Sequence, residues 1–209
     1  MNFPARYKAD IVSAVESIDL EKVVEVIDLF KHARARRRNI FVCGGTRSAS
    51  TASKVLCDMI ACSSFERPVR FRIFALDDRA WKWDADGDTA SSEKLFVEQV
   101  KNFAEPGDVV VGISASDKSA SILRTFEYAA CLGCKIVALT GLDGGKLAAL
   151  ANVAIPVGST NFGTVEDTHV IICHMIGSYF LEFEGRSRGT GPAEATSIDE
   201  AHWQPARRA

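Results

Sequence analysis

Five short runs of apolar, mostly β-branched or aromatic residues recur along the chain, and helix-compatible sequence follows each run. This pattern constrains the fold strongly, because parallel strands need a crossover between them and are then buried on both faces. It predicts an α/β fold, a doubly wound five-stranded parallel sheet flanked by helices. The expected strands are residues 39–43, 70–76, 108–114, 135–141 and 153–157, and the expected helices after them are residues 49–62, 93–103, 119–131, 145–150 and 165–183.

Two further helices are predicted before the first strand. Ile11 and Val15 recur at helical spacing, and Val23 and Ile27 do so again. Since no sheet is predicted beside this N-terminal arm, its apolar faces need another surface to cover them. We therefore expect the first two helices to serve oligomerisation, in a homotetramer or at least a dimer.

The charge balance argues against nucleic acid or a membrane as a partner. The 209 residues carry a formal net charge of −2 at pH 7, and no large excess of basic residues is present. No run approaches the roughly 18 apolar residues of a membrane span, and the N-terminus lacks the apolar segment of a signal peptide. We therefore expect a cytoplasmic protein of a single globular domain.

The six cysteines lie mostly inside apolar elements, as buried thiols do. Cys131 and Cys134 match a C-x-x-C string, but they straddle a helix end and the start of the next strand. No second pair stands at zinc-finger spacing. We interpret both residues as core thiols rather than as a redox or zinc site.

Two loops that follow predicted strands are rich in glycine and serine. They are Gly44–Ser48 after the first strand and Ser114–Ser119 after the third. Ligands of a parallel sheet collect at the carboxyl ends of its strands, where helix N-termini present free N–H groups. Glycine lets the backbone approach a ligand, and serine hydroxyls suit phosphate oxygens.

Helix N-capping would account for one serine hydroxyl in each loop, but not for the three in Ser114–Ser119. Neither loop matches a Walker A sequence or the dinucleotide fingerprint, which disfavours nucleotides. The loops therefore predict a site for a small phosphorylated ligand.

Three spans of the chain resemble the sugar isomerase (SIS) domain, and within it the phosphoheptose isomerase family. They are VCGGTRSASTASKVLCDM, GDVVVGISASDKSASILRTFEYA and IVALTGLDGGKLAALANVAIPV, and the closing helix VEDTHVIICHMI is similar to that family as well. The resemblance implies a flavodoxin-like sheet and a homotetramer with active sites at subunit interfaces. It also implies isomerisation between sedoheptulose 7-phosphate and a heptose 7-phosphate.

The resemblance divides the chain into three parts. Residues 1–38 would be the N-terminal helices for oligomerisation, and residues 39–184 the phosphosugar-binding SIS domain. Residues 185–209, rich in Gly, Ser, Arg and Pro, would be a mobile tail.

The resemblance also assigns roles to individual residues. Those that would hold the phosphate are Ser48, Ser114, Ser116 and Ser119. Those that would lie beside the rest of the substrate are Thr46, Lys54 and Glu166. The acid–base pair would be Asp58 and His174, whereas His169 is expected to be structural. A carboxylate and an imidazole suit this work, because an enediol route needs one group for the carbon-bound proton and another for the oxygens.

Three of these positions depart from the family's pattern. Lys54 replaces a histidine, Asp58 a glutamate and Glu166 a glutamine, and in some members these positions and the histidine at 174 bind zinc. An ammonium group cannot ligate a metal, so a zinc site would reduce to Asp58, Glu166 and His174. We therefore expect no required cofactor. Lys54 would instead stabilise an enediolate oxygen, unless it simply forms a surface ion pair with Asp58.

Bulkier residues than the family's also stand at the mouth of the expected site, at Thr46–Arg47 and at Asp117–Lys118. They suggest a C7 or C8 ketose phosphate that is longer or differently substituted than the common heptulose phosphate. Two alternatives remain, a non-catalytic phosphosugar- or protein-binding regulator of the same fold and an isomerase for a shorter phosphosugar.

Overall fold

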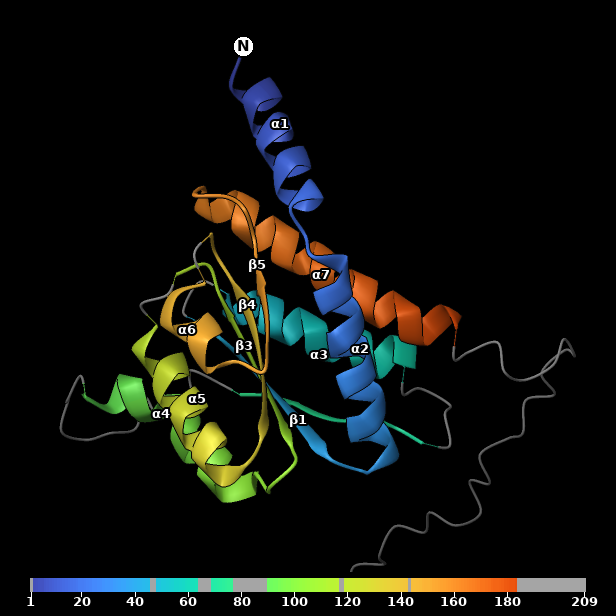
Figure 1. The fold of residues 1–209 in the computed structure, drawn as a ribbon, viewed down its shortest axis with the longest axis vertical. Coiled ribbons are helices and arrows are strands. Elements are labelled where there is room, and N and C mark those ends of the chain that lie inside the picture. Colours follow the sequence, from blue (N-terminus) through green and yellow to red (C-terminus); the bar gives the residue numbers. More distant parts are fainter. Residues whose placement is uncertain are drawn as a thin grey trace, which may run out of the picture.

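A computed structural model of the protein describes residues 2–45, 48–63, 69–76, 90–116, 119–142 and 144–183. Within these ranges the chain forms a five-stranded sheet with helices on both faces (Figure 1). Thr46, Arg47, Asp117 and Lys118 lie outside the described residues, as does the tail of residues 185–209 that we expect to be mobile.

All five strands run parallel, in the order β2-β1-β3-β4-β5. They are β1 (Asn39–Gly44), β2 (Arg72–Ala75), β3 (Val109–Ser114), β4 (Lys135–Thr140) and β5 (Val153–Pro156). The predicted fold class is therefore confirmed. The register places Gly44 opposite Ile113 and Ser114 opposite Thr140, so β1, β3 and β4 end level with one another at the same edge.

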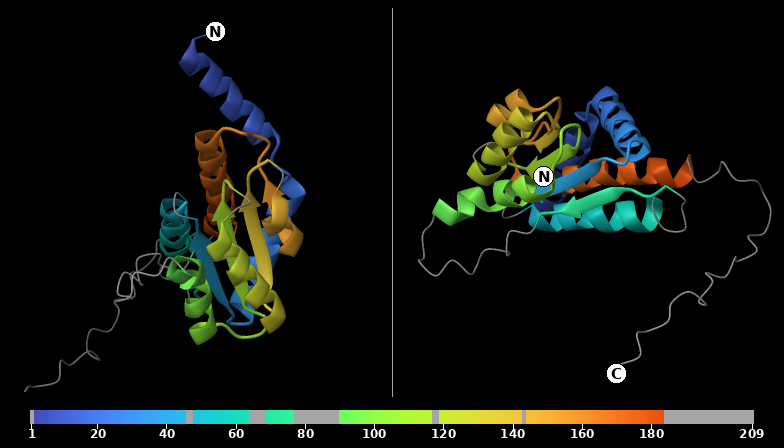
Figure 2. Two further views of the ribbon diagram at one scale, coloured as in Figure 1. Left: turned by 90° about the vertical axis from the view of Figure 1, so that its left-hand side faces the viewer. Right: turned by 90° about the horizontal axis from the view of Figure 1, so that it is seen from below.

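Two helical layers cover the sheet (Figures 1 and 2). One layer contains α2 (Leu20–Ala35), α3 (Ala49–Ser63) and α7 (Phe162–Glu182), and the other contains α4 (Ala90–Phe103), α5 (Ala120–Leu132) and α6 (Gly145–Leu150). Alternate strand residues point to opposite faces. Ile40 therefore belongs to the core cluster under α2, α3 and α7, whereas Phe41 belongs to the cluster under α4, α5 and α6.

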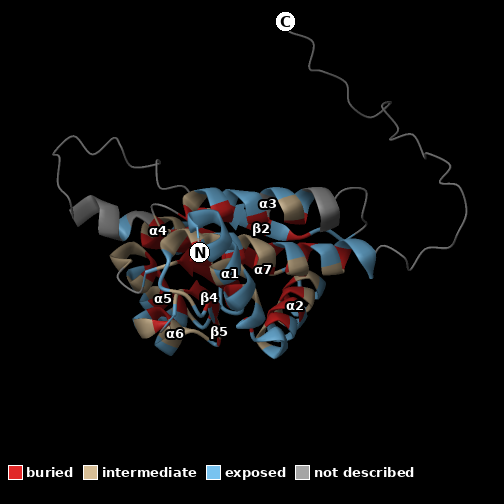
Figure 3. Ribbon diagram, turned by 90° about the horizontal axis from the view of Figure 1, so that it is seen from above, coloured by how far each residue is buried: buried red, intermediate tan, exposed pale blue. Residues whose placement is uncertain are grey.

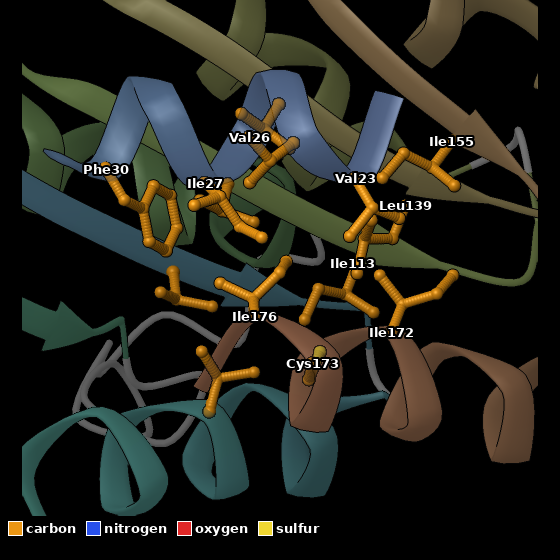
Figure 4. Packing of buried hydrophobic residues seen from close by; sticks show 14 of the residues in the cluster. Val23, Val26, Ile27, Phe30, Ile113, Leu139, Ile155, Ile172, Cys173 and Ile176 are labelled. Atoms are coloured by element: carbon orange, nitrogen blue, oxygen red, sulfur yellow. The ribbon is translucent and has the colours of Figure 1, made fainter. Parts of the chain in front are cut away.

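Figure 4 shows the first of these cores, in which α2 and α7 pack against the sheet. On the other face, Gly112 in the middle of β3 allows α5 to pack closely. A Cβ at that position would lie 2.5 Å from the ring of Phe126, which is shorter than any real contact. Both faces of the sheet are thus filled, and the carboxyl edge of the strands is left for the loops.

We expected no sheet beside the two N-terminal helices, and this expectation is wrong for α2. Val23 and Ile27 are buried against the chain's own sheet and α7, so the apolar face of α2 already has a partner. The helix α1 (Phe3–Glu16) is different, because it projects beyond the sheet and is largely exposed (Figures 1 and 3). Phe3 is 65% exposed. Helix α1 therefore keeps apolar surface that an oligomer could cover, and α2 adds the exposed side chains of Leu20 and Val24.

Two hydrogen bonds fasten α1 and its connection to the body of the fold. The hydroxyl of Tyr7 donates to Asp167 Oδ2 on α7 at 2.8 Å, and the N–H of Gly158 donates to Ser17 Oγ at 2.9 Å. No helix among residues 2–183 that the structure describes is long and apolar enough to cross a membrane.

The helix α7 begins three residues earlier than residue 165, where we predicted its start. Asn161 is its N-cap, and the side-chain Oδ1 accepts hydrogen bonds from the N–H groups of Gly163 (3.0 Å) and Thr164 (3.3 Å). This capping satisfies two amides that would otherwise have no partner. Because the helix starts at Phe162, Glu166 lies in its second turn and not at its start.

The interpretation of both C-x-x-C cysteines as core thiols is wrong for Cys131. This residue is exposed on the last turn of α5, whereas Cys134 is buried. Gly133, with φ of 86°, ends the helix and turns the chain into β4. The side chains of the two cysteines, one before and one after this turn, therefore point in different directions. Burial raises the pKa of the Cys134 thiol to about 11. Cys57, on α3, is exposed as well.

His169 joins α7 to the end of β4. Its Nε2 lies 3.1 Å from the carbonyl oxygen of Thr140, so the tautomer with a proton on Nε2 donates a hydrogen bond to that oxygen. The side chain is fully buried. Burial lowers the pKa of this imidazole to about 4. The ring is therefore neutral in the folded protein at neutral pH, in agreement with the structural role that we expected.

This burial predicts an acid-dependent loss of stability. Below pH 6.5 the unfolded chain takes up a proton at His169 that the folded chain does not bind, so the free energy of unfolding should fall between about pH 6.5 and about pH 4, by up to about 3 kcal/mol. Urea unfolding of His169→Gln, which keeps an N–H donor but does not titrate, should lack this component. The control His32→Gln, on the exposed side of α2, should retain it. An unchanged pH dependence in His169→Gln would contradict the assignment.

Candidate functional site

The two serine-containing loops meet at the carboxyl edge of β1 and β3. The chain turns sharply after β1, since a Cβ at Gly44 would lie 2.2 Å from the carbonyl oxygen of Ser48. Gly45 N–H donates to the carbonyl of Ile113 at 3.0 Å and so fastens this loop to the end of β3. A Cβ on Gly45 would lie 3.3 Å from Ser114 Oγ and 3.6 Å from Ser119 Oγ. The glycine therefore leaves room beside two of the predicted phosphate-binding hydroxyls.

The hydroxyls of this serine loop, Ser114–Ser119, are not used up by helix capping. Ser119 is the N-cap residue of α5, but its side chain makes no capping hydrogen bond; its Oγ lies 3.4 Å from Ser121 Oγ. Ser114 Oγ donates to the carbonyl of Ser116 at 2.7 Å and accepts from the N–H of Ser116 at 3.2 Å, which curls the loop. A curled, hydroxyl-rich loop before a helix N-terminus suits an anion such as phosphate.

The helices α3 and α7 both start at this edge of the sheet and run side by side (Figure 2). Near their starts, Ser48 Oγ donates to Glu166 Oε1 at a long 3.5 Å, and Ser48 is only 2% exposed. Further along, Asp58 on α3 faces His174 on α7. A Cβ built at Gly177 would lie 3.8 Å from Asp58 Cβ. The two helices therefore lie close together at Asp58.

Asp58 lies between a lysine and a histidine. Lys54 Nζ is 2.5 Å from Asp58 Oδ1, and His174 Nε2 is 3.3 Å from Oδ2. The carboxylate side chain is 18% exposed, whereas those of Lys54 and His174 are 47% and 49% exposed. Although His174 is within ion-pair distance, Oδ2 is covered and makes no hydrogen bond to any described residue. The predicted acid–base residues therefore come together, and the ion pair between Lys54 and Asp58 is present as well.

Cys173 is the neighbour of this pair on α7. Burial raises the pKa of its thiol to about 12, and the Asp58 carboxylate adds to the effect. The thiol remains protonated at neutral pH, so it offers no nucleophile to the site.

The serine loop and the Asp58–His174 pair are not adjacent within one chain. Asp58 is almost three turns beyond Ser48, which corresponds to about 15 Å along a helix that rises 1.5 Å per residue. His174 is likewise about 12 Å beyond Glu166 along α7. One chain therefore presents a candidate anion site at the sheet edge and a candidate acid–base pair on the outer side of the α3–α7 layer.

The same spacing bears on the reduced zinc site. Asp58 and His174 could share an ion, but Glu166 lies two turns away and the ammonium of Lys54 already occupies Asp58 Oδ1. Across the described ranges no three acidic, histidine or cysteine side chains are grouped so that they could hold a metal ion. The donors of one chain do not fit zinc, and we derive no step through a metal.

A cleft that sequence reasoning missed lies beside the serine loop, at the ends of β4 and β5 and the start of α7. Its volume is about 370 Å³. The residues that line it include Ser116, Thr140, Leu142, Ser159, Thr160 and Phe162. The signal that could have found it is the LTG sequence at the end of β4, because this strand neighbours β3 and ends at the same edge.

Comparison with known proteins agrees with the fold and with the motifs. A family model described as SIS domain matches residues 5–141. The phosphoheptose isomerase of Nitratiruptor sp. is 32% identical over 150 residues, which are 72% of this chain and 80% of that protein. The phosphoheptose isomerase of Geotalea daltonii is 31% identical over 165 residues, or 78% of this chain and 85% of that protein.

A solved structure supports the same relationship. The phosphoheptose isomerase of Neisseria gonorrhoeae has a TM-score of 0.74 and 26% sequence identity, with 84% of this chain and 95% of that chain covered. Fold, motifs and relatives agree, and the chain belongs to the SIS domain family, in which it is related to the phosphoheptose isomerases.

Proposed function

We propose that the protein is an aldose–ketose isomerase that acts on a sugar phosphate, sedoheptulose 7-phosphate or a related C7 or C8 ketose phosphate. The observation that carries this proposal is the approach of Asp58 on α3 and His174 on α7, which are far apart in sequence, to 3.3 Å. Relatives named phosphoheptose isomerase, at about 30% identity, support the class of substrate.

The reaction needs two proton movements. A base removes the proton from C1 of the ketose, an enediol forms, and the proton returns at C2 to give the aldose. A second group carries the hydroxyl proton from O1 to O2. Asp58 serves the carbon atoms and His174 the oxygen atoms, because a carboxylate and an imidazole are both side chains that act as general acids and bases.

Access to Asp58 depends on its half-exposed neighbours. His174 covers Oδ2 in the free chain and is the group that substrate meets first, so its rotation exposes the carboxylate. Loose contacts of this kind in a free enzyme tighten when substrate binds. The phosphate, held at the serine loop, keeps the sugar within reach and supplies the binding energy for its orientation.

We further propose that each active site is built by two subunits. Asp58 lies about 15 Å beyond Ser48 along α3 in one chain, and the side chain of its neighbour His174 is 49% exposed. A second subunit whose α3–α7 layer covers the first subunit's sheet edge would bring the two parts together. The exposed apolar face of α1 offers surface for such an assembly.

Lys54 provides the positive charge of the proposed site. Its ammonium group is held against Asp58 Oδ1, where it can also stabilise the negative oxygen of an enediolate. The proposed reaction therefore requires no metal ion.

The acid–base assignment predicts that Asp58→Asn and His174→Ala each lower the rate of isomerisation at least about 100-fold. Substrate should still bind, because its phosphate contacts are intact. Incubation of sedoheptulose 7-phosphate in D2O, followed by NMR, would measure proton exchange at C1 and C2. The control Asp28→Asn removes an exposed carboxylate from α2 and should react normally. Full exchange by the double variant would refute the mechanism.

The two-subunit site predicts complementation between inactive variants. Ser116→Asp should abolish phosphate binding by charge repulsion, and Asp58→Asn should abolish proton transfer. In a mixed oligomer, about a quarter of the sites would combine an intact serine loop with an intact pair from another subunit. Co-expressed chains should therefore regain activity that neither variant shows alone. No regained activity in an oligomer proven to be mixed, or a monomeric mass by light scattering, would contradict the proposal.

The role of Lys54 predicts that Lys54→Met lowers kcat at least about tenfold with little change in KM, since its charge acts in the transition state. Dialysis of the wild type against a chelator should leave the rate unchanged. Lys22→Met, which breaks a comparable exposed ion pair on α2, is the matched control. A rate that collapses on chelation and returns with zinc would overturn the metal-free reaction.

A further inference from the structure

The cleft beside the serine loop has the chemistry of a carbohydrate site. Hydroxyl groups of Ser116, Thr140, Ser159 and Thr160 alternate with the apolar side chains of Leu142 and Phe162. All the described residues that line it are uncharged. Sites for small ligands combine an apolar lining with a few placed polar groups. The hydroxyl and apolar groups of these described residues suit the neutral, hydroxyl-bearing part of a sugar.

Thr140 supplies a polar atom that has no partner. The residue is 1% exposed, and its Oγ1 makes no hydrogen bond to any described residue. A buried hydroxyl without a partner destabilises the folded protein. Its backbone carbonyl, in contrast, is already bound by His169. The side-chain hydroxyl of Thr140 is thus the group at this position that a ligand in the cleft can satisfy.

Two glycines shape this part of the cleft. Gly144, with φ of 61°, leaves space around the hydroxyl, since a Cβ there would lie 3.4 Å from Thr140 Oγ1 and 2.5 Å from Ala148 Cβ. A Cβ at Gly141 would lie 2.6 Å from the carbonyl oxygen of Ala115, so this glycine allows the loops after β3 and β4 to meet. The cleft and the serine loop are therefore contiguous through Ala115 and Ser116.

We propose that this cleft is a sugar subsite, in which Thr140 Oγ1 hydrogen-bonds a hydroxyl group of a sugar phosphate whose phosphate lies on the serine loop. The inference rests on the phosphate site of the proposed function, and it adds the residue that distinguishes a sugar phosphate from phosphate alone. The subsite holds the carbon chain between the phosphate and the reacting carbons.

Thr140→Val tests the subsite with two measurements that should change in opposite directions, the thermal midpoint and the affinity for the sugar phosphate. The variant should raise the thermal midpoint of the ligand-free protein, because it removes a buried hydroxyl without a partner. It should weaken binding of sedoheptulose 7-phosphate about tenfold in calorimetry, the effect of one lost hydrogen bond, and leave binding of inorganic phosphate unchanged.

Thr125→Val is the matched control. Thr125 is also fully buried, but its Oγ1 donates to the carbonyl of Ser121 at 2.7 Å on α5. This variant should lower the thermal midpoint and leave the affinity for both probes unchanged. Thr160→Trp, at the exposed rim of the cleft, tests the same site without altering its interior, and it should weaken only the binding of sedoheptulose 7-phosphate.

The outcomes separate the subsite from the proposed function. Wild-type affinity for sedoheptulose 7-phosphate in both Thr140→Val and Thr160→Trp would overturn the subsite alone. A wild-type protein that bound neither sedoheptulose 7-phosphate nor inorganic phosphate would overturn the phosphate site, and the subsite with it. Selective loss of sugar phosphate binding in the two cleft variants would support both.

Discussion

The common direction of the five strands is the constraint on which the rest of the structure depends. Because all strands are parallel, β1, β3 and β4 end at one edge, and pairing between strands that are distant in the sequence brings the loops after them together. The helices that follow must then start at this edge and run back along the sheet. The parallel course of α3 and α7 follows directly, and it places Ser48 beside Glu166 and Asp58 beside His174.

Buried hydrogen bonds and glycines then give this edge its detailed shape. Gly44 and Gly45 allow the tight turn and the attachment to β3, and Gly141 allows the loop after β4 to meet the loop after β3. Polar groups near this edge are bonded within the chain where they support the fold, as at His169 and Asn161. Other buried atoms have no hydrogen-bond partner among the described residues, among them Thr140 Oγ1 at this edge, Thr164 Oγ1 and His169 Nδ1 on α7, and Asp58 Oδ2 farther along α3. Of these atoms, Thr140 Oγ1 belongs to the lining of the cleft in which a sugar is proposed to bind.

The succession of strands and helices along the chain could be predicted from the sequence, whereas the surroundings of individual side chains could be predicted less well. Runs such as Val109–Val111 can only be buried strands in a chain with crossover helices, so the sheet followed from composition and spacing. The start of α7 was missed because Asn161 was not recognised as a cap, and Cys131 was misplaced because spacing does not tell which side of a final helical turn a residue takes. The proximity of Asp58 and His174 depends on the pairing of α3 with α7, which the family resemblance supplied. The unpaired hydroxyl of Thr140 has no sequence signal at all.

The bond between His169 and Thr140 has a geometric consequence for the candidate site residues on α7. It is fully buried, so water cannot replace it when it breaks, and it fixes α7 against the end of β4 at one height. Glu166 and His174 lie on the same rigid helix at set distances from this point. This one buried hydrogen bond therefore sets the distance of both residues from the edge of the sheet.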